Sequence, residues 1–174
     1  MSPPSPSSLP TGGTRLLRAA LASVAAIALA GAAQAQATDG PLKPGEVEIR
    51  RTAHGVPHIR ALDREDLGFG AGYAYAQDNI CLMADQIVTL SGERALHFGA
   101  EGQTTVSFRP IPNVEADVFF RSIFDMDALR QAFTKVDTRY ADMVRGYVAG
   151  YNRYLSDTGH AALPAPCRGA DWVR

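Results

Sequence analysis

Apolar residues recur at helical spacing in the stretch that follows Asp137. They lie three or four positions apart, as on one face of an α-helix, at Tyr140, Met143, Val144, Tyr147, Val148, Tyr151 and Leu155. Asp137 is a favourable N-cap, and Thr158-Gly159 is typical of a helix end. We therefore predict a regular helix here, with a notch of small residues at Gly146 and Gly150.

A second helix is predicted to begin at Arg64, because the side chain of Asp63 can cap it. Gly68, Gly70 and Gly72 each cost this helix about 1 kcal/mol relative to alanine. Gly68 and Gly72 share a face that a second backbone could approach closely, so we expect it to pack deep in a larger assembly. A loop with turn glycines is the alternative.

Asp78-Asn79 is expected to cap or kink the chain before another amphipathic helix. Its apolar stripe comprises Ile80, Met83, Ala84, Ile87, Leu90 and Ser91. Gly92 and Gly99 bracket a last turn, and the stretch from Arg51 to Gly99 is interpreted as a short extended segment, a turn and a helical hairpin. Residues 100–113, with two prolines, are predicted to be a loop.

Two short strands are predicted at residues 46–50, which alternate polar and apolar, and 56–61. Pro57 has no N–H to donate, so the second strand should lie at a sheet edge or pair on its other side. A short helix is expected after Asp125 or Asp127. These elements predict an α+β fold that is mainly helical, with one or two short N-terminal strands.

Residues 1–37 have the pattern of a secretory signal peptide: two arginines, the apolar run Ala19–Ala30, and small-residue cleavage sites after Ala35 and Ala37. The run is shorter than the roughly 20 residues of a membrane-spanning helix; an interfacial anchor is the alternative. Residues 38–45 are predicted to be a linker, and 46–174 one domain. We therefore expect a soluble protein that is periplasmic or secreted.

Charge and cysteine content refine this picture. Without residues 1–37 the chain would carry a net charge of −3, which gives no indication of nucleic-acid or anionic-membrane binding. In an oxidising compartment, two cysteines usually form one disulfide. Cys81 and Cys167 would close a loop of roughly 86 residues, for which the chain-entropy model gives about 4–5 kcal/mol. A reactive thiol or half a metal site is the alternative.

No catalytic or metal-binding pattern stands out. His54 and His58 would be about 13 Å apart in an extended chain, too far to share a metal, while His97 and His160 have no ligand pattern nearby. None of the candidate serines lies in a G-x-S-x-G motif; these are Ser91, Ser107, Ser122 and Ser156. The residues alone indicate an exported, disulfide-linked, mainly helical chain without a metal, a cofactor or a catalytic site.

Five short motifs nevertheless follow one another in order: Gly-Val-Pro-His-Ile at 55–59, Gly-Tyr-Ala-Tyr-Ala-Gln-Asp at 72–78, Met83, Gly92 and Phe98-Gly99. Together they resemble the opening of the penicillin-acylase family of N-terminal-nucleophile hydrolases. Within this family, Cys81 and Glu93-Arg94 make the chain similar to the branch that contains acyl-homoserine-lactone and aculeacin A acylases. Cys167-Arg168-Gly169 resembles a segment of that branch for which a disulfide to the early helix is expected.

The resemblance implies an αββα fold made from one precursor, in which self-cleavage exposes a serine at the start of a β chain. The hydroxyl of that serine would attack the amide carbonyl while its own α-amino group acts as base. This chain matches only the α-chain opening, so the serine would lie beyond Arg174 and no catalytic residue is assigned. Thr38, which cleavage after Ala37 would expose, lies in the linker and is not a candidate.

The implied function is that of an exported amidohydrolase that removes acyl chains from small amides such as N-acyl homoserine lactones or lipopeptides. The expected partners are the β chain of the same precursor and the acylated substrate, without cofactor, nucleic acid or membrane. Residues 160–174 end without a cap, as if interrupted, and the chain alone is expected to be inactive. The alternatives are an exported binding protein without activity and a non-functional gene fragment.

Overall fold

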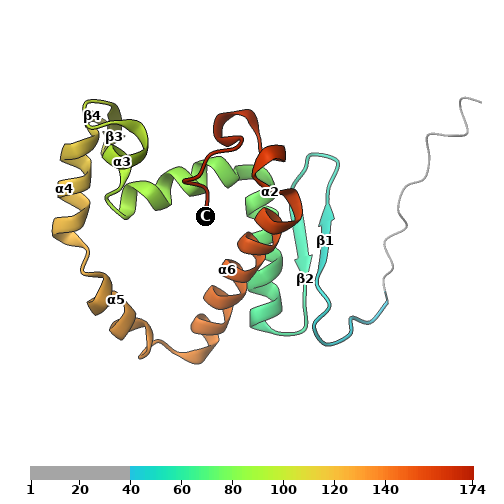
Figure 1. Cartoon of the computed structure of the whole chain (residues 1–174). Coiled ribbons are helices and arrows are strands. Elements are labelled where there is room, and N and C mark those ends of the chain that lie inside the picture. Colours follow the sequence, from blue (N-terminus) through green and yellow to red (C-terminus); the bar gives the residue numbers. More distant parts are fainter. Residues whose placement is uncertain (1–39) are drawn as a thin grey trace, which may run out of the picture. The chain divides into compact units, whose positions relative to one another are not determined.

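The computed structural model describes residues 40–174, which form one unit (Figure 1). The predicted signal peptide and the first two residues of the predicted linker lie outside the described residues. The elements are β1 (Glu48–Arg51), β2 (Pro57–Arg60), α2 (Arg64–Leu90), α3 (Arg94–Phe98), β3 (Gln103–Val106), β4 (Arg109–Pro112), α4 (Asn113–Ile123), α5 (Met126–Phe133), α6 (Thr138–Thr158), and the 3-10 turns η1 (His160–Ala162) and η2 (Ala165–Cys167). The prediction of a mainly helical α+β fold is confirmed. No described helix is both long and apolar enough to span a bilayer.

The strands β1 and β2 lie where two short strands were predicted and pair antiparallel, with Glu48 opposite Arg60 and Arg51 opposite Pro57. Each strand has one unpaired edge, so a proline at the end of β2 costs no ladder hydrogen bond. Gly55 in the turn has a φ of 80°, a left-handed conformation that glycine adopts without strain.

Helix α2 starts at the predicted cap, where Asp63 Oδ1 accepts from the Asp66 N–H at 2.8 Å. It is kinked at Asn79, whose φ of −138° and ψ of 22° are not helical. The Arg51 guanidinium donates to the Ala74 carbonyl at 3.2 Å and to Gln77 Oε1 at 3.0 Å. The end of β1 is therefore tied to the helical turn just before the predicted kink.

The glycine face of α2 packs against the glycine notch of α6 (Figure 1). A Cβ on Gly68 would lie 2.1 Å from the Met143 carbonyl oxygen, and a Cβ on Gly72 would lie 2.0 Å from that of Tyr147. The predicted helical hairpin within residues 51–99 is therefore wrong, because α2 is one kinked helix and its partner is α6. The expectation that this face needs a larger assembly is also wrong, since the same chain covers it.

The two helices run in the same direction along this contact. Gly146 faces the backbone of Glu65 and Phe69, and Gly150 faces that of Phe69 and Tyr73, so higher numbers on one helix meet higher numbers on the other. Two adjacent helices joined by a short loop would run in opposite directions. The intervening segment 91–137 makes the parallel arrangement possible.

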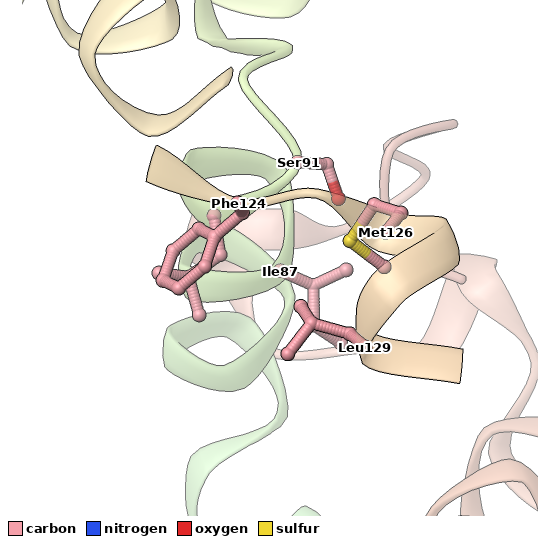
Figure 2. Close-up of a pocket in the computed structure, with 6 residues that line it drawn as sticks. Ile87, Ser91, Phe124, Met126 and Leu129 are labelled. Carbon is pink, nitrogen blue, oxygen red and sulfur yellow. The ribbon is translucent and has the colours of Figure 1, made fainter. Parts of the chain in front are cut away.

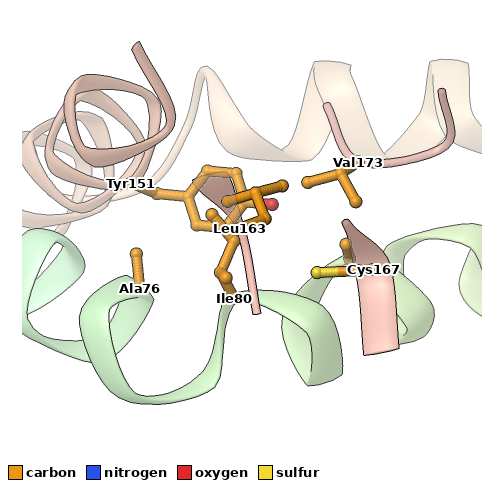
Figure 3. Close-up of a cluster of buried hydrophobic side chains, with 7 residues drawn as sticks. Ala76, Ile80, Tyr151, Leu163, Cys167 and Val173 are labelled. Atoms are coloured by element: carbon orange, nitrogen blue, oxygen red, sulfur yellow. The ribbon is translucent and has the colours of Figure 1, made fainter. Parts of the chain in front are cut away.

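Residues 160–174 complete the core around the second half of α2 (Figure 3). The buried cluster consists of Ala76, Ile80, Ala84, Tyr151, Leu163, Cys167 and Val173. The Sγ atoms of Cys81 and Cys167 are 2.04 Å apart, so a disulfide joins this segment to α2 two residues beyond the kink. The segment that reads as interrupted in the sequence thus supplies three fully buried side chains, Leu163, Cys167 and Val173.

The prediction of a loop at residues 100–113 is wrong, because β3 and β4 form a hairpin there. In its turn, Ser107 and Phe108 have φ values of 47° and 69°. Such values favour glycine or asparagine, so a Ser-Phe pair gives no turn signal in the sequence. Strand β4 contains Pro110 and Pro112. In a sequence, such prolines argue against a strand. Helix α4, which was not predicted, follows Pro112 without a side-chain cap.

The remaining helix predictions are confirmed. Asp125 Oδ1 accepts from the N–H groups of Asp127 and Ala128 at 3.0 Å and caps α5. Asp137 caps α6 through the Arg139 N–H at 2.9 Å, and Gly159 ends that helix. Cap residues were reliable guides because each replaces a hydrogen bond that the helix end lacks.

Candidate functional site

The histidines of the described residues are spread over three parts of the fold. His54 and His58 lie in the exposed β1–β2 hairpin, His97 near the end of α3 and His160 in η1. Within residues 40–174 no group of three His, Cys, Asp or Glu side chains could hold a metal ion. Ser122 Oγ donates to the Phe119 carbonyl at 2.7 Å, which is a local helix contact.

Three tyrosines have perturbed hydroxyls. Burial raises the pKa of Tyr73, Tyr147 and Tyr151, and for Tyr73 the nearby Asp157 carboxylate raises the pKa further. A phenol ordinarily titrates near pH 10, so all three stay protonated at neutral pH. They can pack and donate hydrogen bonds, but they cannot act as general bases there.

The most extensive buried polar cluster surrounds Arg94, the first residue of α3, which is 8% exposed. Its guanidinium donates to Asp85 Oδ1 at 2.8 Å and to Asn113 Oδ1 at 3.1 Å. The two carboxylate oxygens of Asp117 accept the N–H groups of Arg94 and Ala95, each at 2.8 Å. Because the charges are paired and hydrogen-bonded, this cluster joins α2, α3 and α4 rather than offering a reactive group.

An apolar stripe on α6 is left uncovered by the described residues. Tyr140, Val144 and Val148 are 62%, 47% and 51% exposed, and each lies one helical turn from the next. Two positions along an α-helix turn by about 200°, so this stripe faces away from Gly146 and the contact with α2. Helix α5 has no buried residue and exposes Met126, Leu129 and Phe133 as well.

Between α5 and α2 lies an apolar pocket of about 290 Å³ (Figure 2). Its walls are Ile87, Leu90, Ser91, Phe124, Met126 and Leu129. Figure 2 shows the side chains of Ile87, Met126 and Leu129 converging, with the Ser91 hydroxyl as the polar group among them. The exposed apolar side chains of α5 and α6, together with this pocket, are called the uncovered apolar surface below.

The structure therefore contains no described arrangement of nucleophile, base and orienting group. The sequence did not indicate the Arg94 cluster either, because its partners are 5 to 23 residues away in the chain and on other helices. The one sequence signal near it was the Glu93-Arg94 pair.

Comparisons with known proteins match nearly all of the described residues. The family model described as penicillin amidase matches residues 46–169. The acyl-homoserine lactone acylase PvdQ of Pseudomonas fluorescens (strain Pf0-1) is 48% identical over 140 residues, which cover 80% of this chain and 17% of that protein. The aculeacin-A acylase of Actinoplanes utahensis is 43% identical over 131 residues, covering 72% of this chain and 16% of the relative.

A solved structure matches as well. The thermostable penicillin G acylase from Alcaligenes faecalis has a TM-score of 0.61 and 29% sequence identity, and the match covers 72% of this chain and 62% of that chain. The chain spans about a sixth of the length of the curated relatives it matches.

Proposed function

Because the chain belongs to the penicillin amidase family, we propose that it is the N-terminal, α-chain part of an exported amidohydrolase. The enzyme removes the acyl chain from a small N-acyl amide by hydrolysing a linear C–N bond. The observation that carries the proposal is the similarity of residues 46–169 to that family, with 48% and 43% identity to two acylases. The nucleophile is a serine at the start of a β chain that follows this part of the precursor.

The relatives with the higher identities point to two acylated substrates for this protein: N-acyl homoserine lactones and acylated peptides of the aculeacin type. Identity is 48% and 43% to the acylases named for these compounds, against 30% to penicillin acylase 2 of Pseudomonas sp. (strain SE83). The proposal therefore favours an N-acyl homoserine lactone or an acylated peptide over a penicillin.

The lengths of the relatives support a two-chain protein. The 140 matched residues are 17% of the P. fluorescens acylase, which is therefore about 820 residues long. The match to the solved acylase covers 72% of this 174-residue chain and 62% of a chain that is accordingly only about 200 residues long. The solved acylase thus has a short chain, whereas the P. fluorescens relative is a long protein. This difference is what cleavage of a long precursor into an α and a β chain would produce.

The proposed partner for the uncovered apolar surface is the β chain. Exposed apolar side chains line one face of α6 and also lie on α5, and exposed apolar patches mark contact surfaces. On α6 these side chains lie opposite the contact with α2 and remain exposed among the described residues. The Cys81–Cys167 disulfide supports export, because such bonds persist in oxidising compartments, and we infer that residues 1–37 are the signal peptide.

An aspartate at Val144 is expected to weaken binding of the β chain, because it would place a charge inside an apolar contact. The measurement is the amount of β chain that co-purifies with a tagged α chain, expected to fall about tenfold or more. Val56→Asp is the matched control, since Val56 is 55% exposed in the β1–β2 turn, away from this surface. Equal losses with both variants, or none with Val144→Asp, would contradict the assignment.

The substrate class is tested on the complete processed precursor. We expect its kcat/KM for an N-acyl homoserine lactone or an acylated peptide to exceed that for penicillin G at least about tenfold, because the pocket that binds the acyl chain decides which substrate has the better-bound transition state. Release of the free amine measures the reaction. A correctly cleaved protein that hydrolyses none of the three amides would refute the proposed function.

A further inference from the structure

A groove between α3 and α4 exposes apolar side chains on both of its walls. Leu96 of α3 is 77% exposed, and Val114 and Val118 of α4 are 45% and 65% exposed. Val114 and Val118 are four positions apart, so they share one face of α4. Together with Gly92 and Ala95 they line a cavity of about 290 Å³. These residues are distinct from those of the uncovered apolar surface, so the groove is a separate feature of the chain.

Hydrogen bonds fix the two walls of the groove relative to each other. Arg121 Nε on α4 donates to the Gly92 carbonyl at 2.9 Å. The Asp117 carboxylate accepts the N–H groups of Arg94 and Ala95, each at 2.8 Å. Because these polar groups already have partners within the chain, the groove mainly offers apolar side chains to whatever binds it. Its walls are set in advance, so binding would have to order few groups of this chain.

The last residues of the chain lie beside this groove. Val173 is 1% exposed within the core cluster, which fixes the backbone just before residue 174. Arg174 forms an ion pair with Glu93, the residue that directly follows Gly92 of the groove. The backbone at residue 174 is therefore within the length of one arginine side chain of the start of α3.

We propose that the groove binds the segment of the precursor that directly follows Arg174, through an apolar side chain among its first few residues. This inference rests on the proposed function, in which the precursor continues into a β chain. The matched residues are only 17% of the P. fluorescens relative, so a precursor of that kind has a long segment available to fill the groove.

The dimensions of the groove suit this occupant. Val114 and Val118 are about 6 Å apart along α4, at 1.5 Å per residue. An extended chain advances about 3.3 Å per residue, so a short extended piece is long enough to cover both valines. Since hydrogen bonds of Arg94 join α3 to α2, docking there would also set the direction in which the precursor leaves the core.

Photo-crosslinking in the complete precursor tests the proposal. The photoreactive amino acid p-benzoylphenylalanine replaces Val118, whose exposed side chain can be changed without disturbing the core. After irradiation and proteolysis, mass spectrometry identifies the peptide that is joined to α4. We expect it to contain the residues directly after Arg174. The same replacement of Leu96, on the other wall of the groove, should join the same peptide.

Val56 is the matched control, since it is equally accessible in the β1–β2 turn and lies outside the groove. The crosslinker at Val56 should not join the peptide after Arg174. A link from Val118 to another part of the precursor, a link between two copies, or no link above the Val56 control would overturn the proposal.

Hydrolysis of an N-acyl homoserine lactone by the wild-type precursor is measured in parallel, because crosslinking does not depend on catalysis. An active precursor without the expected crosslink would contradict the docking of this segment alone. A precursor that forms the crosslink but hydrolyses no amide would contradict the proposed function and leave the docking intact.

Discussion

Alanine at Gly146 is expected to destabilise the chain by about 3 kcal/mol, among the largest effects of any single methyl group. Its Cβ would lie 1.9 Å from the Glu65 carbonyl oxygen, so α2 and α6 would have to separate. The same substitution in an exposed helix would instead stabilise it by about 1 kcal/mol. Urea unfolding of the purified chain, followed by far-UV circular dichroism, measures the difference.

Gly40→Ala is the control for this experiment, because no heavy atom lies within 4 Å of a Cβ built at Gly40. Its unfolding midpoint should match wild type within error. If Gly146→Ala were as stable as wild type, close packing of the two backbones would not be what joins α2 to α6.

Replacing both cysteines by serine is expected to have the second large effect. It should lower the free energy of unfolding by about 4–5 kcal/mol, for a separation of 86 residues. The disulfide restricts the unfolded chain, and it also holds residues 160–174, with Leu163 and Val173, against the second half of α2. The Cys81→Ser/Cys167→Ser variant should therefore unfold at a lower urea concentration.

Addition of a reductant provides the control. It should shift the unfolding midpoint of the wild-type chain toward that of the double variant and leave the double variant itself unchanged. Equal midpoints for the oxidised chain and the double variant would show that the bond contributes no stability.

Local signals explain which parts of the fold could be predicted. Asp63, Asp125 and Asp137 each cap a helix at the expected place, and Asn79 kinks α2. These predictions rest on hydrogen bonds within a few residues. The β3–β4 hairpin was missed because its turn uses Ser107 and Phe108 at positive φ, against local preference.

Periodicity alone did not reveal which face of α6 is buried. The apolar stripe with Val144 and Val148 remains exposed, while the notch of Gly146 and Gly150 is buried against α2. Small residues carry no hydrophobic signal, yet they allow two backbones to approach. Glycines spaced four apart on both helices were the available clue, and pairing them with each other required the structure.

Even less of the candidate site could be predicted from the sequence, because here too the contacts are not local. Its features join residues far apart in sequence, such as Arg94 with Asn113 and Asp117, or Ile87 with Leu129. The family resemblance supplied the chemistry, and it assigns that chemistry to a serine outside this chain. We accordingly propose that this chain provides packing surfaces and that the nucleophile lies in another part of the precursor.

The central claim is that this chain is one part of an amidohydrolase whose nucleophile lies in another part. The most direct test measures release of free homoserine lactone from an N-acyl homoserine lactone by the purified 174-residue chain and, in parallel, by the complete processed precursor. We predict turnover by the precursor and none above background by the chain alone. Turnover by the purified chain would contradict the account, because a catalytic group would then have to lie within it.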